Sequence, residues 1–145
     1  MKDITDKNIT KRRAVAQAVL HAKPATITML RNGQLPKGDP LPVAKVAAIQ
    51  AAKNTSQIIP YCHPLHLEHI GVEFDVQDNH ITARVEVTAF YKTGVEMEAL
   101  TAVSAAVLTI YDMTKGVDPS MRITDHYLIS KTGGKSDYQV QTASI

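Results

Sequence analysis

The chain has 145 residues and a formal net charge of +2, with 44% hydrophobic and 21% charged residues. This size and composition are ordinary for one globular domain, so we expect a single domain over residues 1–145, with 1–10 and 131–145 flexible. The mild positive charge suits a small anionic substrate as well as nucleic acid and favours neither. One cysteine excludes an internal disulfide, and the polar N-terminus shows no apolar signal segment, so we expect a cytoplasmic protein.

The beginning of the chain predicts a strand followed by a short helix. Residues 11–21 carry alanine and leucine at alternate positions, which is typical of a strand. Residues 24–30 should form a helix that ends at the turn residues Asn32 and Gly33.

A second, alanine-rich helix is expected after a loop rich in glycine and proline. Asp39 followed by Pro40 places an N-cap residue before a proline at the first helical position. The helix should run to about residue 54. Residues 59–64 contain two prolines and should form no regular structure.

From residue 70 onward, apolar residues recur every 2 residues instead of every 3.6. Apolar and polar residues alternate over 70–76 and again over 81–87, and residues 77–80 separate the two runs. This pattern predicts a β-hairpin.

Residues 93–116 predict a helix that is buried on several sides. Thr93 and Glu96 have the spacing of a capping box, and Gly116 could end the helix in a left-handed conformation. Residues 99–111 carry no charge and leave no polar face, yet the run is too short for a membrane span, which needs about 20 apolar residues.

A last strand is marked by Ile123, Tyr127 and Ile129. The order of elements is therefore strand, two helices, hairpin, helix, strand. This order predicts an α+β, ferredoxin-like (split βαβ) fold, an antiparallel sheet with the helices packed on one face.

After the uncharged run, charged residues reappear at the end of the long helix, where Asp112 and Lys115 lie one turn apart. An acid at a helix C-terminus meets the unfavourable end of the helix dipole, and its carboxylate should be hard to ionise unless Lys115 compensates. Opposed influences of this kind tune acid–base groups, so the pair is either catalytic or a surface salt bridge.

Other short patterns are less specific. Cys62, His63, His66 and His69 suggest a zinc site, but Pro64 breaks the local geometry and no second cluster offers a fourth ligand, so we expect no metal. The sequence GGKS at 133–136 lacks the first glycine and the helix of a P-loop. Two lysines next to glycine, Lys37 and Lys135, are either mobile cations for an anion or solvated surface residues.

Several motifs taken together resemble one family: KGD at 37–39, AAK at 51–53, CHP at 62–64, TGVEMEALTA at 93–102, IYDM at 110–113 and GGKS at 133–136. Their identity, order and spacing are similar to those of the cyclic pyranopterin monophosphate synthases of molybdenum cofactor biosynthesis. The resemblance extends from about Asp3 to Tyr138. Tyr61 stands where the family commonly has leucine, and Thr114 where it often has cysteine.

The resemblance implies a lyase that converts (8S)-3′,8-cyclo-7,8-dihydroguanosine 5′-triphosphate to cyclic pyranopterin monophosphate and releases diphosphate. It implies a homohexamer, a trimer of dimers, with sites at subunit interfaces, no required cofactor, and magnesium only as a companion of the triphosphate. The matched motifs give Asp112 and Lys115 as catalytic residues. The matched substrate-binding residues are Tyr61, Cys62, His63, Met97, Glu98, Lys37, Lys53, Lys131, Lys135 and Arg12.

Two other classes of function are open to the sequence. A small oligomeric binding module would explain the apolar helix but not the acid and lysine at its end. An RNA-binding ferredoxin-like domain would need base-stacking aromatic residues on its sheet, and the predicted strands carry only Phe74, Phe90 and Tyr127 in no such motif. We therefore expect a small-molecule substrate, and neither nucleic acid nor a membrane as partner.

Overall fold

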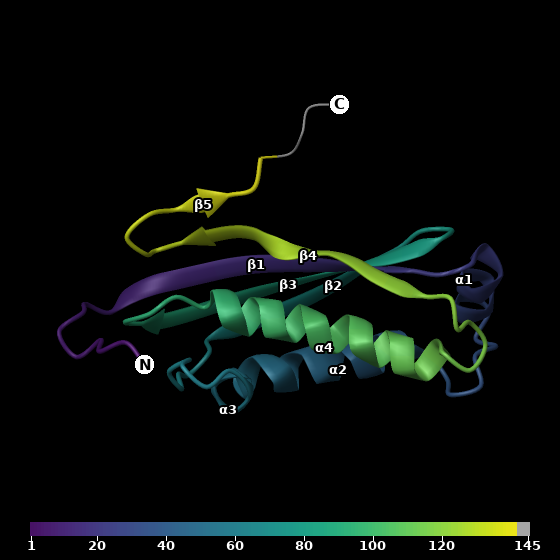
Figure 1. Ribbon diagram of the computed structural model, residues 1–145, viewed down its shortest axis with the longest axis horizontal. Helices are drawn as coiled ribbons and strands as arrows, with labels where there is room; N and C mark the ends of the chain where they lie inside the picture. The colour runs from purple at the N-terminus through teal and green to yellow at the C-terminus, as the bar shows by residue number, and fades with distance from the viewer. Residues whose placement is uncertain (142–145) are drawn as a thin grey trace.

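The computed structural model describes residues 1–141 and contains one antiparallel sheet with helices on one of its faces (Figure 1). The strands follow the order β2-β3-β1-β4-β5 across the sheet. Their bounds are Thr10–His21 for β1, His69–Val76 for β2, His80–Tyr91 for β3, Arg122–Thr132 for β4 and Tyr138–Gln139 for β5. This arrangement confirms the ferredoxin-like prediction. The part of the predicted flexible tail at 142–145 lies outside the described residues.

Four helices lie between the strands: α1 at Pro24–Arg31, α2 at Pro40–Lys53, α3 at Thr55–Ile58 and α4 at Glu96–Thr114. The long helices α2 and α4 lie side by side over the sheet, while α1 sits at one end of the molecule (Figure 1). No helix among residues 1–141 is long and apolar enough to cross a membrane.

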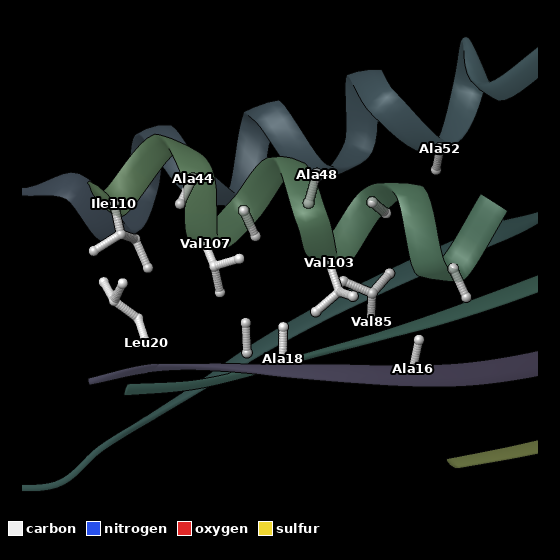
Figure 2. Packing of buried hydrophobic residues seen from close by; sticks show 14 of the residues in the cluster. Ala16, Ala18, Leu20, Ala44, Ala48, Ala52, Val85, Val103, Val107 and Ile110 are labelled. Atoms are coloured by element: carbon white, nitrogen blue, oxygen red, sulfur yellow. The ribbon is translucent and has the colours of Figure 1, made fainter. Parts of the chain in front are cut away.

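The core lies between the sheet and the two long helices, and small residues set its thickness. On β1, every second residue from Ala14 to Leu20 is fully or almost fully buried. On α2 the buried alanines are Ala44, Ala48 and Ala52, which face α4 (Figure 2). Because alanine side chains are short, the helices and sheet approach closely, and valine and isoleucine from β3 and α4 fill the remaining space.

The predicted elements up to the hairpin are confirmed. Asp39 caps α2 by accepting a hydrogen bond from the Leu41 amide at 3.1 Å, and α1 ends at Asn32 with Gly33 in the left-handed region at φ 66°. The hairpin turn closes through the Gln77 amide and the His80 carbonyl at 2.8 Å. The short helix α3 was not predicted, because a single turn has no detectable period.

Both predicted ends of α4 are wrong. Val95 is the N-cap residue and no side chain caps the helix, because the Glu96 carboxylate folds back against Gly94 instead of pairing with Thr93. At the other end Gly116 is not in the left-handed region. After α4, the amides of Val117 and Asp118 donate hydrogen bonds to the Thr114 carbonyl. The side chain of Asp118 then accepts a hydrogen bond from the Lys23 amide, which fixes this segment to the residue before α1.

The prediction that α4 is buried on several sides is wrong for the single chain. The face toward α2 and the sheet is buried, but the outer face is not. Leu108 is 57% exposed, and Thr101, Ala105 and Thr109 are partly exposed. Within the part of the chain that the structure describes, no second layer of structure covers this face.

Candidate functional site

A small hollow lies where the loop after α3 meets the start of α4. Tyr61, Cys62 and His63 line one wall, and the other wall runs from Thr93 to Glu98. The hollow has a volume of about 110 Å³. Pro60 and Pro64 prevent regular structure in the loop, which turns through a hydrogen bond from the Cys62 amide to the Ile59 carbonyl at 3.1 Å.

Glu98 is the acidic group of this hollow, and its side chain is almost out of solvent, at 5% exposure. Burial raises the pKa of Glu98 to about 7, and the charge of nearby Glu96 acts in the same direction. Burial and the same two carboxylates also raise the pKa of the Cys62 thiol. A carboxyl group that titrates near neutrality can donate or accept a proton at physiological pH.

Cations gather near the same end of the molecule. Arg12, at the start of β1, is only 8% exposed, yet its guanidinium makes one long hydrogen bond, 3.4 Å to the Lys92 carbonyl, and its Nε has no partner among the described residues. Gly134 lies directly against Arg12, so the GGKS loop that carries Lys135 passes over the guanidinium. A buried, under-satisfied guanidinium is suited to an anionic ligand.

The GGKS loop requires glycine at Gly133. This residue has φ 92°, and a Cβ there would collide with the Lys11 carbonyl. Thr10 Oγ1 donates to the Gly133 carbonyl at 2.8 Å and fixes the loop to β1. Lys131 stands opposite Ala14 in the strand register, so its side chain leaves the sheet on the helix side.

Lys7 belongs to this group, although sequence reasoning missed it. Partial desolvation lowers the pKa of Lys7, and the charges of Arg12, Lys2 and Lys135 lower it further. The N-terminal segment is held near these cations by the buried side chain of Ile4 and by a hydrogen bond from Lys92 Nζ to the Thr5 carbonyl at 2.9 Å. No local pattern in a polar N-terminus marks such a position.

Lys37, Asp112 and Lys115 meet at the far end of α4. Lys115 Nζ lies 3.0 Å from Asp112 Oδ1, and Lys37 Nζ lies 3.6 Å from Asp112 Oδ2 and donates to the Asp112 carbonyl at 3.1 Å. The hydrogen bond and charge of Lys115, with the charge of Lys37, lower the pKa of Asp112. The two lysines therefore favour the charged form of Asp112.

The structure thus divides the predicted site residues between two ends of the molecule. Helices α2 and α4 are antiparallel, so Lys53 at the end of α2 lies with the start of α4 (Figure 2). Glu98 and Asp112 are fourteen residues apart on one helix, about 21 Å at 1.5 Å per residue. The Glu98 end holds Arg12, Lys53, Tyr61, Cys62, His63, Met97, Glu98, Lys131 and Lys135. The Asp112 end holds Lys37, Asp112 and Lys115.

The histidines after Cys62 do not assemble a metal site. Within residues 1–141, no three side chains of His, Cys, Asp or Glu lie close enough to hold a metal ion. His66 and His69 are instead spread along the loop and the first residue of β2.

Residues 1–134 match the model of a protein family described as "MoaC family". This chain belongs to the MoaC family. It is 51% identical over 137 residues to a cyclic pyranopterin monophosphate synthase of Listeria welshimeri, covering 94% of this chain and 86% of the relative. Proteins of the same name from Syntrophomonas wolfei and Chloroflexus aurantiacus are each 50% identical to this chain. The two alignments cover 97% and 96% of this chain, and 91% and 87% of the respective relative.

Proposed function

We propose that this protein is a lyase that converts the 3′,8-cyclised dihydro derivative of guanosine triphosphate to cyclic pyranopterin monophosphate and diphosphate. The observation that carries this proposal is membership of the MoaC family, with about 50% identity to synthases of that name over nearly the whole chain. The reaction belongs to an early stage of molybdenum cofactor biosynthesis. We place the protein in the cytoplasm, where guanosine triphosphate is available.

The Glu98 end supports binding of a triphosphate. Arg12 is buried without a carboxylate partner among residues 1–141, and Lys7 and Lys135 lie near it. Together with Lys53 and Lys131, these residues supply several cations for the phosphates and can stabilise the negative charge on the departing diphosphate. The proposal needs no resident cofactor, and magnesium would arrive with the triphosphate as part of the substrate.

Two acid–base systems are available for the ring chemistry. Glu98 titrates near neutrality beside Cys62 and His63, and we propose that their hollow receives the ring system of the substrate. Asp112 and Lys115 are hydrogen-bonded to each other, and Lys115 is the available proton donor of that pair. Ring rearrangement and formation of a cyclic phosphate both require proton transfers, which positioned side chains of these kinds carry out.

The separation of these two systems supports a site shared between subunits. One small substrate cannot contact both Glu98 and Asp112 of the same chain when they lie about 21 Å apart. Antiparallel pairing of α4 with its copy across a two-fold axis would bring the start of one helix to the end of the other. The exposed outer face of α4, with Ala105 and Leu108, is available for that contact. We propose that this pair is the dimer within a hexamer.

Turnover of the cyclised triphosphate tests the proposal directly. The purified protein should release one diphosphate per substrate and form a product with pterin absorbance, while the Asp112→Asn variant serves as the control for a contaminating activity. Tight binding without diphosphate release would identify the protein as a binding module and overturn the proposal.

A further inference from the structure

The residues before β1 fold back over the end of the molecule where α4 begins (Figure 1). Asp3 Oδ1 accepts hydrogen bonds from the Thr5 amide at 2.9 Å and from the Thr5 hydroxyl at 2.6 Å. The Lys7 amide donates to the Ile4 carbonyl at 3.1 Å. Residues 3–8, which we name the N-terminal strap, therefore form a hydrogen-bonded turn.

Two contacts hold the strap to the rest of the chain. The side chain of Ile4 is buried, with 8% of its surface exposed. Lys92, the residue after β3, donates from Nζ to the Thr5 carbonyl at 2.9 Å. Within residues 1–141 Lys92 forms no ion pair, so this hydrogen bond is what fixes its ammonium group.

The strap carries a charged residue to each part of the Glu98 end. Partial desolvation lowers the pKa of Lys7, and the charges of Arg12 and Lys135 lower it further. Hydrogen bonds within the strap lower the pKa of Asp3, and the charge of His63 acts in the same direction. Because His63 lines the hollow, the strap extends from the hollow to the group of cations.

Lys92 connects the strap with Arg12. Its carbonyl accepts the 3.4 Å hydrogen bond from Arg12 Nη2, while its ammonium holds the Thr5 carbonyl. A change of the Lys92 side chain therefore releases the strap and leaves the backbone contact to Arg12 in place.

We propose that Lys92 is a positioning residue for the proposed site: by holding the strap, it keeps Lys7 beside Arg12, where the two cations receive phosphates of one substrate. Like charges repel, so Lys7 needs a fixed anchor to stay near Arg12 before an anion arrives. An anchored cation also costs less ordering when the ligand binds. Lys92 itself makes no contact with the ligand in this role.

The inference deepens the proposed function and rests on it for the identity of the ligand, a triphosphate. Binding of inorganic triphosphate tests the inference without turnover, so the two can fail separately.

Isothermal titration calorimetry of the full chain with inorganic triphosphate measures the effect of Lys92. Lys92→Met keeps an unbranched side chain without the charge and should weaken binding about tenfold, the value of about one charge-assisted contact. Lys92→Arg should restore most of the affinity, because a guanidinium can also donate to the Thr5 carbonyl. Lys45→Met is the matched control, since Lys45 is an exposed lysine of α2 outside the proposed site, and it should bind as the wild type does.

A double-mutant cycle separates positioning from direct contact. If Lys92 acts through Lys7, Lys92→Met should weaken binding by less than about twofold in a Lys7→Ala background. Losses that add would mean that Lys92 contacts the phosphates itself, and would overturn the positioning role.

Hydrogen exchange, followed by mass spectrometry, reports on the strap directly. Amide exchange in residues 3–8 should be faster in Lys92→Met than in the wild type, and unchanged in Lys45→Met. With the cyclised triphosphate as substrate, Lys92→Met should raise KM about tenfold and leave kcat within about twofold, because a binding contact is lost and no proton donor.

Three results would contradict the proposal: no binding of inorganic triphosphate by the wild type, wild-type affinity in Lys92→Met, or unchanged exchange of the strap in that variant. A wild type that binds inorganic triphosphate through Lys92 but does not turn over the cyclised triphosphate would instead count against the proposed function and leave this inference standing.

Discussion

Glu98 shows how the fold changes the chemistry of one residue. In the sequence it is one of two glutamates at the start of a helix, a position where the helix dipole favours a negative charge. In the structure its burial dominates, and the pKa rises to about 7. The desolvation of a carboxylate therefore outweighs the dipole at this site.

The raised pKa predicts a pH dependence of stability. Folding makes Glu98 hold its proton up to about pH 7 instead of 4.5, so the free energy of unfolding should fall as the pH rises from 4.5 to 7. Glu98→Gln removes this cost and should stabilise the protein by up to about 3 kcal/mol at pH 8, with no gain at pH 4. Urea denaturation at both pH values measures the difference.

The control for this prediction is Glu68→Gln, because Glu68 is exposed. It should change stability by less than about 0.5 kcal/mol at either pH. An equal effect of Glu98→Gln at pH 4 and pH 8 would show that the gain does not come from the ionisation of Glu98.

Asp118 is the opposite case, a fully buried carboxylate that stays charged. Burial alone would raise its pKa, but Oδ1 accepts from the Ser120 amide and hydroxyl and Oδ2 from the Lys23 amide and Thr26 hydroxyl, and these bonds lower the pKa to about 2. The side chain thus joins the start of α1 to the segment between α4 and β4.

Replacing Asp118 should destabilise the protein. Asp118→Asn places an amide N–H₂ group against two donors, and we expect a loss of about 2–4 kcal/mol at pH 7. The folded-state pKa is below the usual 3.8, so the part due to ionisation is present above about pH 4 and disappears as the pH falls through 2. Thermal or urea unfolding at pH 7 and pH 3 should show a smaller difference at the lower pH, while the exposed control Asp6→Asn stays within about 0.5 kcal/mol of wild type.

At the scale of elements, the middle of α4 packs in the core, and its two ends carry residues of the proposed site. Its buried face follows the helical period through Ala99, Val103, Ala106 and Ile110, and this face fixes the helix on the sheet. The charged residues at its end lie outside the core, so function can change there without loss of the fold.

Asp112→Asn and Lys115→Ala should therefore separate activity from stability. The pair is exposed and screened by solvent, so its loss should leave the folding free energy nearly unchanged. If the two groups handle protons in the reaction, each change should lower turnover at least about a hundredfold. Diphosphate release and thermal unfolding, measured on the same samples, test both statements.

Arg31→Ala provides a matched control, since Arg31 and Asp78 form another exposed ion pair, at 2.8 Å, away from α4. This variant should keep normal turnover. Near-normal turnover in the Asp112 or Lys115 variant would remove that residue from the mechanism.

At the scale of the whole molecule, the sheet and α4 hold the two groups of site residues apart. Lys37 and Asp112 are separated by 75 residues in sequence and meet at one end, whereas Glu98 and Asp112 share a helix and cannot meet within one chain. The proposed site, which uses both groups, therefore requires two chains.

Mixing of inactive subunits tests this shared site. Glu98→Ala and Asp112→Asn chains, unfolded together and refolded at equal concentration, should regain about a quarter of the wild-type activity. Half of the dimers are then mixed, and each mixed dimer has one intact site of two. Turnover of the mixture, compared with each parent refolded alone, measures the recovery.

A second mixture sets the background. Asp112→Asn and Lys115→Ala chains carry their changes at the same end of α4, so neither site of a mixed dimer is intact and no activity should return. If the first mixture stays inactive while native mass spectrometry detects mixed oligomers, the shared-site model is wrong.

The sequence by itself determined the elements and the family. Helix and strand periods depend on neighbouring residues, so α1, α2, the hairpin and the body of α4 could be predicted, and the motifs around Cys62 and Glu98 pointed to the family that the comparisons show. The ends of α4 could not be predicted, because Val95 and Asp118 act there through contacts that no local pattern contains.

Only the tertiary structure decided how the proposed site residues are arranged. It placed Lys7 and Lys135 near a buried Arg12, brought Lys37 to Asp112, and raised the pKa of Glu98. These properties depend on desolvation and on charges from distant parts of the chain, and both arise only when the sheet and helices pack together.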